Sequence, residues 1–395
     1  MITTSFNSRC RLLASLTIFV LGSFFLPNNS HAQFKKIAPG FDANECDALL
    51  RLNFAFTDTT AHQRFSNFQQ DYEFLYRSPG IGLDNVWDLW LRQDSTVVIL
   101  LRGTTANMTS ILADFYSAML PAKGKIQLAE GNIFEYKLAD SDRAAVHAGF
   151  LIGFAFLADD MQPKIDSLYQ LGYRDFLISG HSQGGALAYY ISAWLNYLKK
   201  DQVYQDIRVK TYASASPKLG NMYFAYDYDN MTREGWAFSI INSDDAIPEM
   251  PFTTQQVDID MNQPNPIFGL MKRFDDLPFF KRVVLKHAFK KMIRNAAKSS
   301  ESYQKYLGSS LEDFIISALP DLELPKPINT TYFIRPGIPI SLIANENYYE
   351  YFKANDGPYY HHGIISYRFL LREYYTGLEP LNEDDVKYLL KGKYD

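Results

Sequence analysis

The chain has 395 residues, a formal net charge of −5 and 47% hydrophobic residues. A mildly acidic chain has no general electrostatic reason to bind nucleic acid, and its length suits one large domain with insertions. The two cysteines, Cys10 and Cys46, form no cluster with histidine at metal-ligand spacing. We therefore expect no metal ion and no other cofactor.

Residues 1–32 have the pattern of a secretory signal peptide. Two arginines precede an apolar run from Leu12 to Leu26, and the triplet that ends at Ala32 fits a small-x-small cleavage site. The alternative is an N-terminal membrane anchor, but the apolar run is short for a bilayer span. We expect cleavage near Ala32, which leaves residues 33–395 as a secreted or periplasmic protein.

The remaining chain alternates between helical and strand-like segments. A helix is expected over residues 42–56, with Asp42 as its N-cap and Glu45 three residues later. The other expected elements are strands at 86–92, 96–101, 176–179, 209–213 and 237–241, and helices at 110–119, 149–171, 186–198 and 364–371. This alternation predicts an α/β fold, a mostly parallel central sheet covered by helices on both faces.

A Gly-x-Ser-x-Gly motif, Gly180 to Gly184, joins one expected strand to the helix that follows it. Such a turn is typical of the nucleophile elbow of an α/β-hydrolase fold, with Ser182 at its tip. The flanking glycines are needed because the chain passes so close to itself that a Cβ atom would clash. The turn also puts the serine at a helix N-terminus, where developing negative charge is favoured.

A nucleophilic serine needs an orienting acid and a base, which follow it along the chain in this fold. Asp244 and Asp245 come directly after the expected strand at 237–241. A loop after a parallel strand is the right place for the acid. Spacing alone does not separate the two aspartates.

Three histidines lie beyond these aspartates. His287 is in a basic segment and is expected at the surface, whereas His361 and His362 directly precede the expected helix at 364–371. One of this adjacent pair should be the base. The pair could also suggest a metal site, but adjacent side chains point apart and no third ligand is evident.

An oxyanion requires two N–H donors. The first is the backbone N–H of Gln183, directly after the serine, so its side chain should be of minor importance. The second is expected from Thr104, in the loop that follows the strand at 96–101. Thr104 could donate both its N–H and its hydroxyl.

Residues 253–335 interrupt the strand–helix alternation with a basic, largely helical insertion. The stretch from Met271 to Lys298 within it carries nine basic residues, Lys272, Arg273, Lys281, Arg282, Lys286, Lys290, Lys291, Arg294 and Lys298. Large apolar residues lie between them, which is the pattern of an amphipathic helix. The segment is either a solvated helix packed on the body or a surface that meets anionic lipid or an oil–water interface.

Together these motifs resemble the class 3 lipases, the secreted fungal-type triacylglycerol lipases and their relatives. The matching segments are Val98–Thr104, Val146–Phe150, Gly180–Gly185, Thr211–Asn221 and Asp245–Pro248. The family usually has leucine where this chain has Gln183. The resemblance covers roughly residues 75–252 and 337–370, and the insertion lies outside it.

The resemblance implies a role for several residues. The acid loop of the family favours Asp245 over Asp244, and a tyrosine five positions after the base favours His362, with Tyr367. His147 and His181 would then be structural rather than catalytic.

By the same resemblance, the lid over the site corresponds to residues 106–145, within a single domain that spans residues 33–395.

The implied function is that of a secreted serine hydrolase which cleaves lipid esters, in the first place a triacylglycerol lipase. A carboxylesterase or phospholipase with the same triad is the alternative, and a catalytically silent lipid-binding protein is the third reading. The expected partners are a lipid or ester substrate and, transiently, a lipid–water interface. No obligate protein partner is evident.

Overall fold

The computed structural model describes residues 36–54, 56, 71–352, 357 and 359–381. The expected signal peptide, residues 1–32, lies outside these ranges. Within them, no helix is both long and apolar enough to cross a bilayer. The expected division into one domain with a lid and an insertion stays a prediction.

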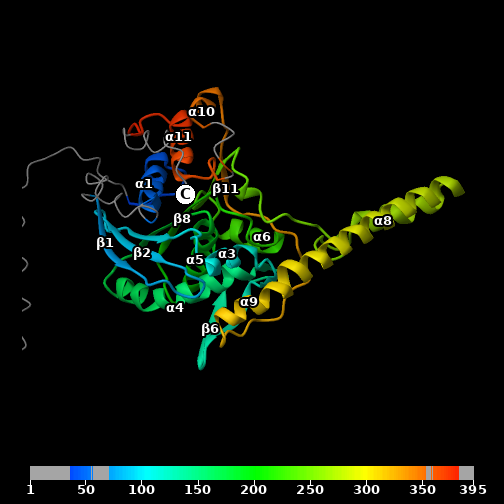
Figure 1. Ribbon diagram of the computed structural model, residues 1–395, viewed down its shortest axis with the longest axis horizontal. Helices are drawn as coiled ribbons and strands as arrows, with labels where there is room; N and C mark the ends of the chain where they lie inside the picture. Colours follow the sequence, from blue (N-terminus) through cyan, green and yellow to red (C-terminus); the bar gives the residue numbers. More distant parts are fainter. Residues whose placement is uncertain (1–35, 55, 57–70, 353–356, 358, 382–395) are drawn as a thin grey trace, which may run out of the picture. The chain divides into compact units, whose positions relative to one another are not determined.

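Seven strands form the central sheet, in the order β1-β2-β3-β8-β9-β10-β11 (Figure 1). The strands are β1 Tyr72–Arg77, β2 Trp87–Arg92, β3 Val97–Leu101, β8 Asp175–His181, β9 Arg208–Ser214, β10 Ala237–Asn242 and β11 Ile338–Leu342. The pairs from β3 to β11 are parallel, and β1, β2 and β3 pair antiparallel. The prediction of a mostly parallel α/β-hydrolase sheet is confirmed, and the predicted strands agree with the observed ones to within two residues at each end.

Helices precede, separate and follow the strands of the sheet along the chain, and several of them pack on it, whereas α7 and most of α8 extend away from it (Figure 1). They are α1 Ala43–Phe54, α3 Met108–Phe115, α4 Ala148–Gln170, α5 Gln183–Lys200, α6 Met222–Met231, α7 Pro266–Arg273, α8 Phe279–Tyr303, α9 Ser310–Ala318, α10 Glu346–Tyr351 and α11 Ile364–Tyr374. Short 3₁₀ turns lie at Ile247–Glu249 (η2) and Phe274–Asp276 (η3), and a π-helical segment, Gln304–Ser309 (η4), joins α8 to α9.

Strand β9 shows how both faces of the sheet are covered. The hydroxyl of Thr211 donates a hydrogen bond to Ser192 of α5, while the next residue, Tyr212, donates to Glu45 of α1. Successive side chains of a strand point to opposite faces, so α5 lies on one face and α1 on the other. Helix α11 packs with α1, and α4 packs with α5.

Helix α1 begins as predicted, but one of its residues has a different role. Asp42 caps the helix by accepting from the backbone N–H groups of Asn44 and Glu45. The Glu45 side chain does not return to the cap. It is buried and forms ion pairs with Arg92 and Lys210. Packing of α1 on the sheet therefore outweighs the local capping pattern.

The region between β3 and α4 is only partly helical. The helix predicted over 110–119 spans Met108–Phe115, because the Ser117 backbone N–H donates to the Leu307 carbonyl, 2.9 Å away, instead of continuing the helix. Two small antiparallel sheets follow, β4 Met119–Pro121 with β7 Ala145–His147, and β5 Lys123–Ala129 with β6 Asn132–Lys137.

Candidate active site

Ser182 lies at the sharp turn between β8 and α5. Its backbone has φ 62° and ψ −129°, a conformation that L side chains rarely adopt. A Cβ on Gly180 would lie 2.1 Å from the Gly184 carbonyl oxygen, and a Cβ on Gly184 would lie 2.1 Å from the Leu101 oxygen. Both glycines of the motif are therefore required by backbone contacts, as the elbow pattern predicts.

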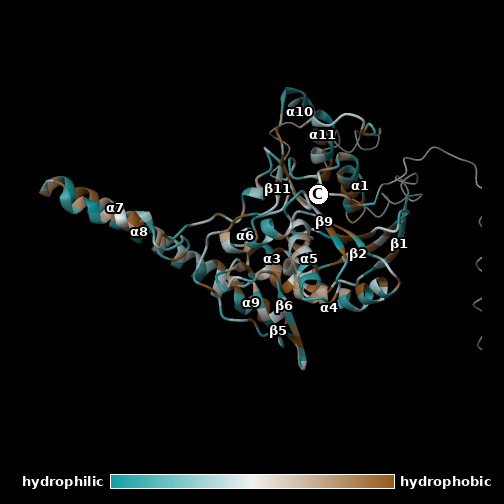
Figure 2. Ribbon diagram, turned by 180° about the vertical axis from the view of Figure 1, so that it is seen from behind, coloured by the Kyte–Doolittle hydropathy of each residue, from teal (hydrophilic) through white to brown (hydrophobic). Residues whose placement is uncertain are grey.

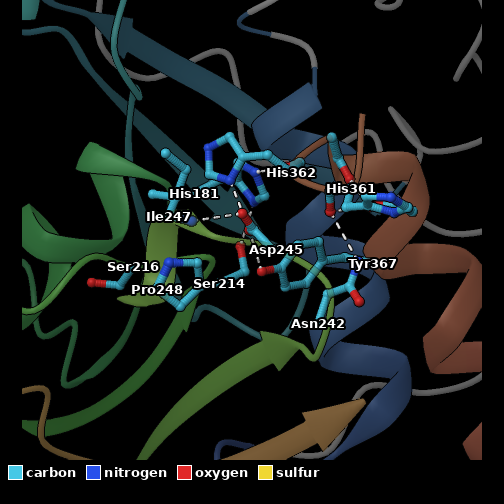
Figure 3. A network of polar contacts seen from close by, with 12 residues as sticks. His181, Ser214, Ser216, Asn242, Asp245, Ile247, Pro248, His361, His362 and Tyr367 are labelled. Carbon is cyan, nitrogen blue, oxygen red and sulfur yellow. Dashed lines mark hydrogen bonds and ion pairs between the residues drawn. The ribbon is translucent and has the colours of Figure 1, made fainter. Parts of the chain in front are cut away.

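Asp245 and His362 are brought together from loops 117 residues apart. The His362 Nδ1 lies 2.7 Å from the Asp245 Oδ2 (Figure 3). The same carboxylate accepts from the Tyr367 hydroxyl at 2.6 Å and from the Ile247 backbone N–H at 2.9 Å. Burial raises the pKa of Asp245, but the hydrogen bonds from His362, Tyr367 and Ile247 outweigh it, so the pKa is lowered overall.

An ionised Asp245 determines the tautomer of His362. Because a carboxylate only accepts hydrogen bonds, the proton of a neutral His362 lies on Nδ1. The Nε2 atom then carries a lone pair. That atom can take a proton from a hydroxyl group, which is the property that a base in a serine triad needs.

His181, the residue before Ser182, connects the elbow to the loop that carries His362. Its Nε2 donates to the His362 carbonyl oxygen at 2.7 Å, and its Nδ1 accepts from the Ser214 hydroxyl at 2.9 Å. The two histidine rings have centroids 4.9 Å apart. Burial, with the nearby His362, lowers the pKa of His181 to about 3. His181 therefore stays neutral, and its two hydrogen bonds connect the elbow to Ser214 and to the loop that carries His362.

Asp244 and His361, the alternative candidates for the acid and the base, form hydrogen bonds with α10 instead. Asp244 accepts from the Tyr349 hydroxyl at 2.7 Å, and the His361 Nδ1 lies 2.7 Å from the Tyr348 hydroxyl. Both tyrosines belong to α10. Of the adjacent residues that the sequence leaves open, the structure pairs Asp245 with His362.

The loop after β3 runs directly beside the elbow. A Cβ on Gly103 would lie 2.9 Å from the His181 carbonyl oxygen and 3.4 Å from the Ser182 Cβ. Thr104 follows Gly103, and Gln183 follows Ser182. The two residues predicted to bind an oxyanion thus follow the carboxyl ends of the adjacent strands β3 and β8, Thr104 in the loop after β3 and Gln183 at the start of α5.

A single carboxylate on α3 links these two residues. The Asp114 Oδ2 accepts from the Thr104 hydroxyl at 2.8 Å, and its Oδ1 accepts from the Gln183 side-chain amide at 3.0 Å. The Gln183 amide also lies 3.3 Å from the Ser110 carbonyl. The Gln183 side chain, which was expected from the sequence to matter less than its backbone N–H, thus makes two hydrogen bonds to α3.

Asp114 lies in an environment that resists its ionisation. Burial raises the pKa of Asp114 to about 6, and the hydrogen bonds from Thr104 and Gln183, with the nearby His362, only partly offset this effect. The sequence did not single out Asp114. It was nevertheless visible as the one charged residue in the helix predicted over 110–119.

The other predicted site residues have the following positions. His147 is buried at the start of α4, where it accepts from the Phe150 N–H at 3.5 Å. His287 is exposed on α8. Among the described residues, no group of three or more His, Cys, Asp or Glu side chains is arranged to hold a metal ion.

When the chain is compared with models of known protein families, one of them matches the part of the chain that contains most of these motifs. The family model described as lipase (class 3) matches residues 98–255. The resemblance to the class 3 lipases is confirmed. The class 3 lipase match contains Thr104, Ser182 and Asp245, while His362 lies beyond it.

Individual relatives match parts of the chain. A secreted mono- and diacylglycerol lipase of Malassezia restricta is 29% identical over 157 residues, 39% of this chain and 46% of the relative. A secreted mono- and diacylglycerol lipase of Fusarium solani is 31% identical over 107 residues, 27% of this chain and 29% of the relative. The chain thus spans less than half the length of these curated relatives.

Solved structures of fungal lipases are also similar. The crystal structure of a lipase from Rhizopus microsporus var. chinensis has 17% identity and a TM-score of 0.39, over 58% of this chain and 77% of that one. A fungal lipase–inhibitor complex has 18% identity and a TM-score of 0.40, over 53% of this chain and 74% of that one.

Proposed function

We propose that this protein is a secreted serine ester hydrolase that acts on lipid esters, in the first place a triacylglycerol lipase. The observation that carries the proposal is the contact of 2.7 Å between Asp245 and His362, whose carbonyl oxygen accepts a hydrogen bond from His181, the residue before the strained Ser182. The class 3 lipase match and the names of the secreted acylglycerol lipase relatives support the substrate class and the secretion.

In the proposed first step, the Ser182 Oγ attacks the ester carbonyl carbon while its proton passes to the His362 Nε2. Asp245 keeps the proton of His362 on Nδ1 and stabilises the imidazolium that forms. The carbonyl oxygen becomes an oxyanion, which accepts hydrogen bonds from the backbone N–H of Gln183 and from Thr104.

The second step releases the alcohol. The tetrahedral intermediate collapses, the bond between the carbonyl carbon and the alcohol oxygen breaks, and His362 gives its proton to the leaving oxygen. A water molecule then attacks the acyl-serine, with His362 again as the base, and the carboxylic acid leaves as Ser182 regains its proton.

The test is the rate of tributyrin hydrolysis as the concentration crosses the solubility limit, with Ser182→Ala as the blank. A lipase that works at an interface should show a jump in rate when droplets appear. Smooth saturation below the limit, with no further rise, would favour a carboxylesterase. Full activity in the Ser182→Ala variant would refute the serine mechanism.

A further inference from the structure

The turn from η3 into α8 exposes large apolar side chains. Phe280 is 82% exposed, Val284 65% and Phe279 64%. Helix α7, which precedes this turn, has no buried residue, and its Leu270 is also exposed. We call Phe279, Phe280, Val283 and Val284 the apolar tip of the α7–α8 hairpin. A cluster of exposed apolar side chains of this kind marks a binding surface.

These side chains are not the ones that pack the hairpin together. The Phe274 ring of η3 contacts the Phe289 ring of α8, with centroids 5.4 Å apart. At the other end of α8, Tyr303 is buried against Phe252 and Phe333. Because the internal contacts use other residues, the apolar tip is free to contact something outside the described chain.

Basic residues surround the apolar tip. Residues 272–298 contain nine lysines and arginines against two acidic residues, Asp275 and Asp276, although the whole chain carries a net charge of −5. Within the described ranges, Lys286 is the only one of the nine with an ion pair, to Asp275. Figure 2 shows hydrophilic and hydrophobic residues interleaved along α7 and α8.

The combination of exposed apolar and basic side chains indicates which kind of surface the hairpin binds. Apolar side chains with lysine and arginine beside them match the boundary between acyl chains and anionic headgroups, where both kinds of side chain are satisfied. The apolar surface of a typical protein partner is depleted in lysine at its centre. The charge therefore favours an anionic lipid surface over a second protein.

The hairpin is also connected to the region expected to cover the active site. The π-helical segment η4 continues α8, and its Leu307 carbonyl accepts from the Ser117 N–H just after α3. Helix α9 packs on α3. Further along, the backbones of Gln127 and Glu323 exchange hydrogen bonds of 3.2 and 3.0 Å. Helix α3 carries Asp114, so the insertion is bonded to the neighbourhood of Thr104 and Gln183.

We propose that the α7–α8 hairpin binds anionic lipid surfaces, with the apolar tip among the acyl chains and the basic residues at the headgroups. The binding itself does not depend on the activity of the protein. Its consequence, that α3 and the oxyanion residues are held at the lipid surface, rests on the proposed function.

The test is flotation of the full chain with vesicles of equal parts phosphatidylglycerol and phosphatidylcholine, or of phosphatidylcholine alone. Ser182→Ala is used so that no lipid is hydrolysed. We expect binding to the anionic vesicles at least about tenfold stronger than to the neutral ones, and weaker as salt screens the charges.

Two variants separate the apolar and basic contributions. The pair Phe279→Ser with Phe280→Ser should weaken binding to anionic vesicles about tenfold or more, and Lys290→Gln with Lys291→Gln several-fold. The matched controls are Leu171→Ser, which removes a side chain 75% exposed at the end of α4, and Lys199→Gln on α5. Both controls should bind like the parent.

Several outcomes would overturn the proposal. These are equal binding to neutral and anionic vesicles, no binding to either, and full binding by the Phe279→Ser, Phe280→Ser pair. A dimer in size-exclusion chromatography that this pair abolishes would make the tip an interface between two copies. In the Ser182 background, turnover of a soluble ester shows that each variant is folded. Vesicle binding without any ester turnover would refute the proposed function alone.

Discussion

Asp245 receives three hydrogen bonds, and each reaches it from a different direction: from His362, from Tyr367 and from the backbone of Ile247. This leaves the carboxylate fixed and ionised. An amide in its place would keep the shape but could donate to the His362 Nδ1. The proton of His362 would then lie on Nε2, and that nitrogen could no longer accept the hydroxyl proton of Ser182.

Asp245→Asn should therefore lower kcat about 10⁴-fold, while KM changes little. The measurement is steady-state hydrolysis of a soluble butyrate ester. Asp244→Asn is the matched control, since Asp244 bonds to Tyr349 instead. Equal losses in the two variants would contradict the assignment of the acid.

Asp114 should make a pH-dependent contribution to stability. Its folded pKa, about 6, lies above the ordinary value near 3.9. The folded state therefore binds more protons than the unfolded state between these values, and stability falls as the pH rises through this window. Asp114→Asn removes the ionisation, so the Tm difference between the variant and wild type should shift in favour of the variant by about 2–4 °C from pH 4 to pH 8, whatever the lost hydrogen bond costs at both pH values.

The activity of the same variant reports on a different property. In Asp114→Asn, the amide oxygen can still accept from one partner, but it cannot accept from both Thr104 and Gln183. We expect kcat on a soluble ester to fall about tenfold, with the oxyanion contacts weakened rather than lost. An unchanged kcat would mean that Thr104 is positioned without Asp114.

At the scale of elements, the elbow depends on the close approach of β8, α5 and the loop after β3. Gly184→Ala would put a Cβ 2.1 Å from the Leu101 carbonyl oxygen, a contact that only a backbone shift can relieve. We expect a loss of at least about 3 kcal/mol in the free energy of unfolding. Denaturant unfolding measures this loss.

Gly269→Ala is the control, because a Cβ at this exposed position of α7 has nothing within 4 Å. Alanine is the better helix former, so this variant should be as stable as wild type or more stable by up to about 1 kcal/mol. A similar loss in both variants would show that the elbow is more adaptable than the contacts indicate.

The elements that local patterns define could be predicted from the sequence, and those that tertiary contacts define could not. Five of the seven strands of the central sheet, the elbow and the cap at Asp42 follow from short-range periodicity and spacing, whereas β1 and β11 were not predicted. The end of α3 and the role of Glu45 depend on partners more than 40 residues away, Leu307 and Arg92. The bonds of Asp114 to Thr104 and Gln183 had no signal beyond one charge in an apolar helix.

On the scale of the whole molecule, one buried carboxylate joins α1 to α11. Asp47 accepts from Arg368 at 3.0 Å and from Arg372 at 2.8 Å, and it also pairs with Arg51. Burial alone would raise the pKa of Asp47, but the three arginines outweigh it and hold the pKa well below its ordinary value. The ionised carboxylate therefore stabilises the fold above about pH 4, and this contribution is lost as the pH falls further.

Asp47→Asn should cost about 3–5 kcal/mol in the free energy of unfolding at pH 7, because it removes the buried negative charge that offsets three largely buried arginines. The cost should stay constant between pH 5 and 8 and shrink below pH 4 in urea titrations. Glu379→Gln is the control. Its carboxylate pairs with Arg51 but is 77% exposed, so the change should cost less than about 1 kcal/mol. A cost for Asp47→Asn that does not vary with pH would argue against the ion pairs as its cause.

The contact between Asp47 and Arg368 joins residues 321 positions apart in the sequence, and this separation determines when the contact can form during synthesis and folding. Contacts between residues so distant along the chain form slowly, because the entropy of closing a long loop is lost before the contact stabilises the fold. During synthesis, this contact also cannot form until most of the chain has been made. A nascent chain that has reached α10 already contains Ser182 and Asp245, but neither His362 nor the arginines of α11. In the proposed mechanism, such a nascent chain already has its nucleophile and its acid but lacks its base, so it is inactive until the segment with His362 has been made.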